Sequence, residues 1–130
     1  MLRISAKIGL SNISGIGLFS DQFIPKGTTT WQYDSKFDTS FDEADLAEMP
    51  DVARGPFLKY SYFDHDLGKY ILCSDYQRFI NHSASPNIAS TPTRDIAMRD
   101  IDEGEELTCD YTMYEHDWFD RHGLKKEDFR

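Results

Sequence analysis

The chain has 130 residues, of which 23 are acidic and 14 are basic, so its formal charge at pH 7 is −9. This length predicts one domain, 1–130, with a real core, and nine Phe, seven Tyr and two Trp can fill it. The acidic charge disfavours nucleic acid and favours a basic peptide as partner, although it serves solubility equally well.

Short strands bounded by turn residues are expected along most of the chain. Apolar residues near period two and runs of Thr and aromatic residues indicate strands because such side chains suit a pleated surface. These strands are expected at Ile4 to Ile8, Gly17 to Phe23, Thr28 to Tyr33, Lys59 to Asp64, Lys69 to Cys73, Arg94 to Arg99 and Glu106 to Tyr111. The pattern predicts a mostly β fold of several short sheets.

Helical structure is expected in few places. Ser40 can cap a short helix with Glu43 three residues later, and Pro50 ends its apolar pattern. The remaining expected segments are an irregular stretch through Gly55-Pro56, a helical turn at Tyr76 to Asn81, a loop from Asn81 to Pro92 and a helical, charged tail from Glu115.

Neither the cysteines nor the histidines form a metal-binding pattern. Cys73 and Cys109 lie far apart and show no CxxC motif, which excludes a disulfide scaffold and a thiolate zinc site. The four His residues, at 65, 82, 116 and 122, do not form a recognisable ligand set, so no metal is expected. No run of about 18 apolar residues is present, and we expect a soluble intracellular protein, cytoplasmic or nuclear/nucleoid, without membrane contact.

Three segments carry most of the functional information. They are GIGLF (Gly15 to Phe19), RFINHSASPN (Arg78 to Asn87) and GEELTCDY (Gly104 to Tyr111). Taken alone, the first is an ordinary turn, the second a loop in which Asn and His satisfy backbone groups, and the third a turn before a strand. Their occurrence together, in this order and at these separations, is difficult to obtain by chance.

With these segments the chain resembles SET-domain protein lysine methyltransferases, which use S-adenosylmethionine. The resemblance runs from Ile4 through Tyr111 and implies a β-clip, SET-like fold with a pseudoknot near the active site. It also implies a small helical insert at about 34–58 and a C-terminal lid or tail at about 112–130. The chain looks like a minimal SET domain, without pre-SET or zinc-binding post-SET elements.

The resemblance assigns roles to particular residues. Tyr111 would be the catalytic tyrosine, and Ile16, Gly17, Asn81 and His82 would bind the cofactor. Trp118 would help to close the cofactor pocket, for which Tyr114 and Phe119 are further candidates.

The same resemblance implies a lysine channel. Tyr60 and Tyr62 would line it, but the KYSYFDHD segment aligns with the family in two ways, so Phe63 on the opposite face stays an alternative. Cys109 stands where many family members carry Phe or Tyr, and a small side chain there leaves room for di- or trimethyl-lysine unless another aromatic residue fills the gap from elsewhere. The substrate would be a lysine-containing protein such as a histone or another basic protein.

Two other functions remain open at this point. A SET-like binding module would keep the fold, and even the cofactor, without turnover. An acidic structural adaptor would bind no cofactor at all.

Overall fold

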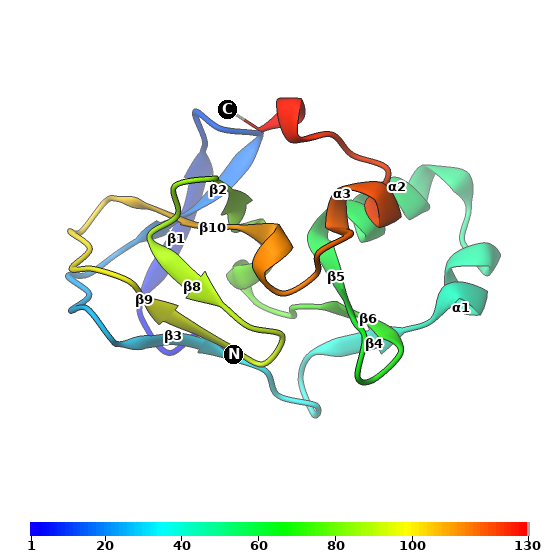
Figure 1. Ribbon diagram of the computed structural model, residues 1–130, viewed down its shortest axis with the longest axis horizontal. Coiled ribbons are helices and arrows are strands. Elements are labelled where there is room, and N and C mark those ends of the chain that lie inside the picture. The colour runs from blue at the N-terminus through cyan, green and yellow to red at the C-terminus, as the bar shows by residue number, and fades with distance from the viewer. Residues whose placement is uncertain (130) are drawn as a thin grey trace.

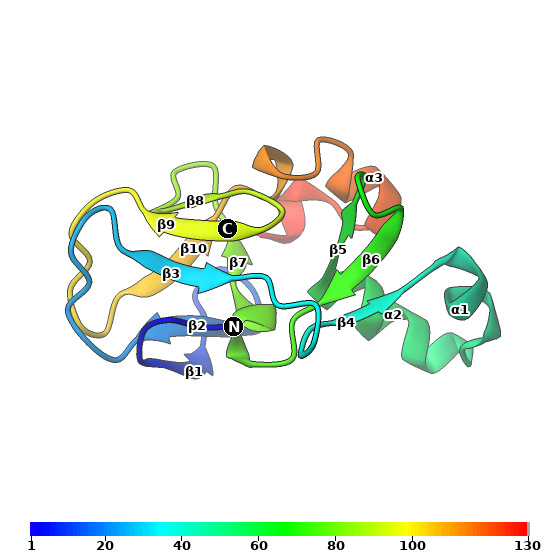
Figure 2. The same cartoon turned by 90° about the horizontal axis from the view of Figure 1, so that it is seen from below.

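The computed structural model describes residues 1–129 and contains two β-sheets (Figures 1 and 2). The larger, curled sheet has the order β1-β2-β10-β8-β9-β3, with β7 beside β10. Its strands are β1 (Ala6–Leu10), β2 (Ile16–Ser20), β3 (Thr29–Gln32), β7 (Asn81–His82), β8 (Ile88–Ser90), β9 (Arg94–Ala97) and β10 (Glu106–Cys109). The smaller sheet, of order β4-β6-β5, comprises β4 (Thr39–Phe41), β5 (Ser61–Asp64) and β6 (Lys69–Leu72). The mostly β architecture expected from the sequence is therefore confirmed.

Strand β10 joins parts of the chain that are far apart in sequence. It pairs antiparallel with β2, where Leu107 lies opposite Leu18. It also pairs parallel with β7, where Thr108 lies opposite Asn81, and with β8 through Cys109. This arrangement brings the third sequence segment beside both of the others.

Two pairs of the expected strands form hairpins. β1 and β2 pair around a turn in which Gly15 has a φ of +49°, a left-handed conformation that suits glycine. β5 and β6 pair around a turn at Gly68, whose φ is +66°.

The start of the first helix differs from the expectation. Ser40 lies in β4 and pairs with β6, so it does not cap the helix. Helix α1 (Glu43–Glu48) begins instead after Asp42, whose carboxylate accepts a hydrogen bond from the Asp45 N–H, while the Asp45 carboxylate accepts one from the Asp42 N–H. Asp42 and Asp45 thus form the capping box that was expected two residues earlier, at Ser40 and Glu43.

The Gly55-Pro56 segment was expected to be irregular, and this was wrong. It lies inside helix α2 (Asp51–Tyr60), which begins after Pro50. Pro56 removes one helical hydrogen bond, but the two helices still cover one end of the smaller sheet (Figure 2). A second apolar cluster forms there, around Phe41, Leu46, Tyr70 and Leu72.

Two short strands, β7 and β8, interrupt the stretch that was expected to be all loop. The expected turn before it is the 3-10 helix η1 (Tyr76–Phe79). After β10 come the 3-10 helix η2 (Tyr111–Met113), helix α3 (Trp118–His122) and the 3-10 helix η3 (Lys126–Asp128). The tail is thus partly helical, as predicted.

The main core lies between the curled sheet and the C-terminal segment. Its fully buried members include Leu18, Ile24, Ile88 and Ile101, and Trp118 from the tail belongs to the same cluster. Within residues 1–129, none of the helices is both long enough and apolar enough to cross a membrane.

Candidate active site

Asn81 fastens the second sequence segment to the first. Its side-chain amide donates to the backbone carbonyls of Ser14, at 3.0 Å, and Ile16, at 3.3 Å, and also to the Glu106 carboxylate at 3.2 Å. Asn81 is buried in β7, so these bonds fix the turn around Gly15 against the strand that precedes Tyr111. Ile16 stays partly exposed beside this turn.

Gly17 is required by the close approach of Glu106. A Cβ atom at Gly17 would lie 2.8 Å from Oε2 of Glu106 and 3.0 Å from Cβ of Ser11. The Glu106 carboxylate also accepts a hydrogen bond of 2.8 Å from the Ser11 hydroxyl. The second glycine of the GIG turn therefore has an internal packing reason, in addition to the cofactor contact that the resemblance implies.

His82 is buried and accepts a hydrogen bond from the main chain of the third segment. Its Nδ1 lies 3.2 Å from the Tyr111 N–H, which makes Nδ1 the acceptor and leaves the proton on Nε2. Burial lowers the pKa of His82, opposed by the nearby Asp110 carboxylate and assisted by Lys126. The ring is accordingly neutral at pH 7 and serves as a fixed acceptor.

Tyr111 lies where the segments meet. Its hydroxyl donates a 2.6 Å hydrogen bond to the backbone carbonyl of Ile80, the residue before Asn81. Burial raises the pKa of Tyr111 well above its ordinary value, with the neighbouring Cys109 and Tyr60 as further causes. Tyr111 therefore keeps its proton, and it can orient a neighbouring group but not act as a base near neutral pH.

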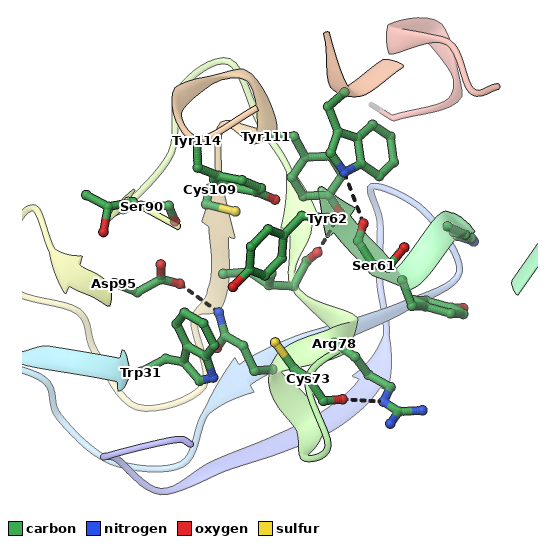
Figure 3. Close-up of a pocket in the computed structure, with 16 residues that line it drawn as sticks. Trp31, Ser61, Tyr62, Cys73, Arg78, Ser90, Asp95, Cys109, Tyr111 and Tyr114 are labelled. Carbon is green, nitrogen blue, oxygen red and sulfur yellow. Dashed lines mark hydrogen bonds between the residues drawn. The ribbon is translucent and has the colours of Figure 1, made fainter. Parts of the chain in front are cut away.

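One narrow cavity of about 40 Å³ begins at Tyr111 (Figure 3). Four of the residues expected at a substrate channel or catalytic position line it together: Tyr60, Tyr62, Cys109 and Tyr111. A water molecule needs about 10–15 Å³ of such space, so the cavity has room for a few waters or one slim aliphatic chain.

The structure resolves the ambiguous register of the aromatic strand. Tyr60 ends α2 and Tyr62 lies in β5, and both face the cavity. Phe63 points the other way, into the second core, where its ring contacts Tyr70 and the Arg121 guanidinium. Tyr62 is held by a 2.6 Å hydrogen bond from its hydroxyl to the Pro92 carbonyl.

Cys109 is completely buried in the wall of the cavity. Burial raises the pKa of its thiol, and the Asp95 charge adds to this, so the thiolate needed for a nucleophile does not form near pH 7. The aromatic that stands next to it is Tyr114, which also lines the cavity (Figure 3).

Trp118 is placed beside Tyr111 rather than beside His82. Its ring centroid is 4.5 Å from that of Tyr111, and its Nε1 donates to the Ser61 carbonyl at 3.2 Å. The aromatic rings next to His82, other than Tyr111, are Phe119 at 5.0 Å and Phe129 at 5.9 Å between centroids. The tail thus covers the His82 side of the site with two phenylalanines.

Sequence reasoning missed three charged groups at this site. Lys59 and Asp95 line the cavity, and Glu106 connects Gly17 with Asn81. The ammonium of Lys59 lies 3.7 Å from the position that a Cβ on Gly15 would occupy, so it reaches the outside of the GIG turn. Only Glu106 lay within a recognised motif, and no local pattern marked Lys59 or Asp95.

Away from the cavity, the structure brings His65 close to His116 and Asp117, about 50 residues later in the sequence. His65, His116 and Asp117 have ligand-type atoms within 4.8 Å of one another at the surface. His65 Nε2 lies 3.4 Å from the Asp117 carboxylate, and the two imidazole rings are stacked. The expectation that the protein needs no metal stays a prediction.

Comparisons with known proteins agree with this geometry. The sequence model of the SET domain matches residues 15–112. Among solved structures, an active polycomb repressive complex 2 in the basal state gives a TM-score of 0.64 at 21% identity over 83% of this chain. The complex in its stimulated state gives 0.65 at 22% identity, also over 83% of this chain. The Chaetomium thermophilum complex gives 0.62 at 25% identity over 83% of this chain.

The chain spans about 15% of the length of each of those matched chains. No curated protein matches it. The family match covers most of the chain, from the GIG turn through Tyr111, and the three segments that carry the resemblance lie side by side in the structure. The chain therefore belongs to the SET domain family.

Proposed function

We propose that this protein is an S-adenosylmethionine-dependent methyltransferase that acts on the side-chain amine of lysine in a protein. The observation that carries the proposal is the single cavity that Tyr60, Tyr62, Cys109 and Tyr111 share. Its walls include six aromatic side chains, whose faces suit an extended aliphatic chain with a cationic end. The NHS and GIG segments meet at the same tyrosine through Asn81 and His82.

The residues around the GIG turn fit the proposed cofactor. Exposed backbone at Gly15 and Ile16 allows close approach, and the Lys59 ammonium beside it would pair with the carboxylate of the methionine part. Phe119 and Phe129, beside His82, offer aromatic faces to the adenine. When bound, S-adenosylmethionine supplies an electrophilic methyl group on a positively charged sulfur.

The protein's part in the reaction is alignment. In-line displacement needs the reacting atoms within about 3–3.5 Å of each other, and rigid cavity walls provide this. The Tyr111 hydroxyl donates its proton in a hydrogen bond to the Ile80 carbonyl. The lone pairs of its oxygen are therefore free to accept hydrogen bonds from an amine or weak ones from methyl C–H groups. Apolar walls lower the pKa of a lysine amine by disfavouring the ammonium form.

The partner proposed for this site is a lysine-containing, basic protein such as a histone. The formal charge of −9 attracts a cationic partner over long distances and increases its rate of association.

Calorimetry followed by mass spectrometry tests the proposal. We expect the protein to bind S-adenosylmethionine and to methylate lysine in a panel of basic peptides. Lys59→Met should weaken binding of the cofactor, whereas Lys36→Met, at an exposed position, should not. Cofactor binding with no methylated peptide from any basic protein would favour a binding module, and no cofactor binding at all would favour an adaptor.

A further inference from the structure

A buried carboxyl group lies in the wall of the cavity. Asp95 extends from β9 and is 3% exposed, and it lines the same cavity as Tyr111 (Figure 3). Its well-formed side-chain hydrogen bond comes from the Gln77 amide, at 2.6 Å from Oδ2. A carboxyl group in such a place is costly unless it has further polar partners.

Two polar groups near Asp95 lack a hydrogen-bond partner within residues 1–129. Trp31 Nε1 and the Ser90 hydroxyl, both at the cavity wall, are buried without a well-formed hydrogen bond in this part of the chain. Ser90 is opposite Asp95 in the β8–β9 pairing and is near enough to favour the ionised carboxyl. Two unpaired donors and a carboxylate among the residues that line a space of this size are the partners that a buried water requires.

Methyl transfer to lysine releases a proton inside the site. The substrate enters as an ammonium, must lose one N–H proton to expose its lone pair, and leaves as a methylated ammonium. Walls that exclude bulk water also block the simplest route for that proton. Tyr111, with its raised pKa, cannot take it.

We propose that Asp95 accepts the proton of the substrate ammonium through water held between Asp95, Trp31 and Ser90. This inference rests on the proposed function. One N–H bond of the ammonium breaks, water passes the proton on, and an O–H bond forms on the carboxylate. The freed lone pair of the amine would then form a bond to the methyl carbon as the carbon–sulfur bond breaks, so that neutral S-adenosylhomocysteine leaves and the positive charge stays on the methylated nitrogen. Asp95 returns its proton to solvent after the product leaves.

The titration of Asp95 suits this task. Burial raises its pKa to about 7, while the nearby Ser90 hydroxyl and the hydrogen bond from the Gln77 amide act to lower it. A group with a pKa near the working pH can both accept and release a proton in each cycle. Four titratable groups at the cavity have pKa values that are raised mainly through burial and partly through the Asp95 charge: Tyr62, Cys73, Cys109 and Tyr114. Tyr60 and Tyr111 line the cavity as well. The cationic residues at the cavity are Lys59 and Arg78.

The pH dependence of turnover tests the acceptor role. Asp95→Asn keeps the shape and the Gln77 contact but cannot take a proton. We expect its kcat at pH 7 to fall by roughly 10²-fold, and the loss to shrink as the pH approaches that of free lysine ionisation. Trp31→Phe, which removes one water donor, should give a smaller loss with the same recovery. Asp102→Asn, at an exposed turn, should match the unaltered protein.

A second measurement on the unaltered protein needs no turnover. A high-resolution crystal structure should show ordered water within hydrogen-bond distance of Asp95 and Trp31 Nε1, and a dry cavity there would overturn the proposal. An active protein whose Asp95→Asn variant keeps both rate and pH profile overturns the acceptor role alone. An unaltered protein that methylates nothing at any pH overturns the proposed function and the acceptor role together.

Discussion

The hydroxyl of Tyr111 donates a hydrogen bond of 2.6 Å to the backbone carbonyl oxygen of Ile80. Ile80 directly precedes Asn81, whose amide holds the GIG turn, and Tyr111 directly follows Asp110 at the end of the third segment. One bond thus fixes the side chain at the meeting point of the cavity and the proposed cofactor site. The orientation of the tyrosine oxygen follows from it.

Removing this hydroxyl should abolish methyl transfer without unfolding the protein. In Tyr111→Phe the Ile80 carbonyl loses its partner, which costs about 1–3 kcal/mol of stability. Loss of the orienting oxygen should lower kcat by roughly 10²-fold or more. Mass spectrometry of a methylated peptide measures the rate, and calorimetry should show that cofactor binding persists. Unchanged turnover in this variant would remove Tyr111 from the reaction.

Filling the space beside Cys109 should change the product. Cys109 is small and lies in the cavity wall, so the unaltered protein should add two or three methyl groups. Cys109→Phe should restrict the product toward monomethyl-lysine, at an overpacking cost of about 1–3 kcal/mol. Cys109→Ala is the matched control and should keep the product distribution. Intact-mass analysis of the peptide distinguishes these outcomes, and identical products from all three proteins would contradict the prediction.

A methyl group at Gly17 should disturb the turn through Glu106. Because a Cβ there meets Oε2 of Glu106 at 2.8 Å, Gly17→Ala must displace the carboxylate that Asn81 and Ser11 contact. We expect a loss of roughly 1–3 kcal/mol in stability and weaker cofactor binding.

Gly55→Ala provides the comparison for that substitution. Gly55 is exposed in α2 with nothing near its Cβ position, so the change should instead stabilise the helix by about 0.5–1 kcal/mol. Thermal unfolding of both variants measures the difference. Equal effects at the two glycines would show that Glu106 does not constrain Gly17.

Stability should depend on pH through Asp95. Burial raises its pKa from 3.8 to about 7, so the folded protein keeps a proton that the unfolded chain releases in this range. This stabilisation is complete below the ordinary pKa and is lost as the pH rises to about 7. The Asp95→Asn variant cannot titrate at this position. Its free energy of unfolding, relative to that of the unaltered protein, should therefore rise by up to roughly 4 kcal/mol as the pH increases from the ordinary pKa of Asp to about 7.

Denaturant titrations of the two proteins between acid and neutral pH measure this difference. His82 titrates in both proteins, so its contribution cancels in the comparison. A difference between the two proteins that stays constant with pH would mean that Asp95 titrates normally.

Local sequence patterns predicted most of the strands, although not β4, β7 and β8, and the family resemblance implied a pseudoknot near the active site. They could not place the tail, because its contacts are distant in sequence. Glu115 reads as one more charge in a polar tail, yet it is buried and accepts a 2.7 Å contact from His122 Nε2 as well as a hydrogen bond from the Phe63 N–H. Trp118 is buried for the same reason, since β5 and the tail meet only in the folded chain.

Some of the residues that line the cavity could be predicted from the sequence, and others could not. Tyr111 and Cys109 belong to a recognisable segment, so their places could be anticipated. Asp95 lies in an ordinary strand pattern, where alternation predicts a face but not that Gln77 and Ser90 meet the carboxyl. Lys59 reaches the GIG turn only because α2 ends beside it, and that helix was not expected.

A crystal structure with S-adenosylhomocysteine and a lysine peptide tests the central claim most directly. The account predicts the cofactor at Gly15, Asn81 and His82, and the lysine in the cavity between Tyr60 and Tyr62. The sulfur and the lysine nitrogen should then face each other beside the Tyr111 hydroxyl. A cofactor bound elsewhere, or a lysine outside this cavity, would contradict the account.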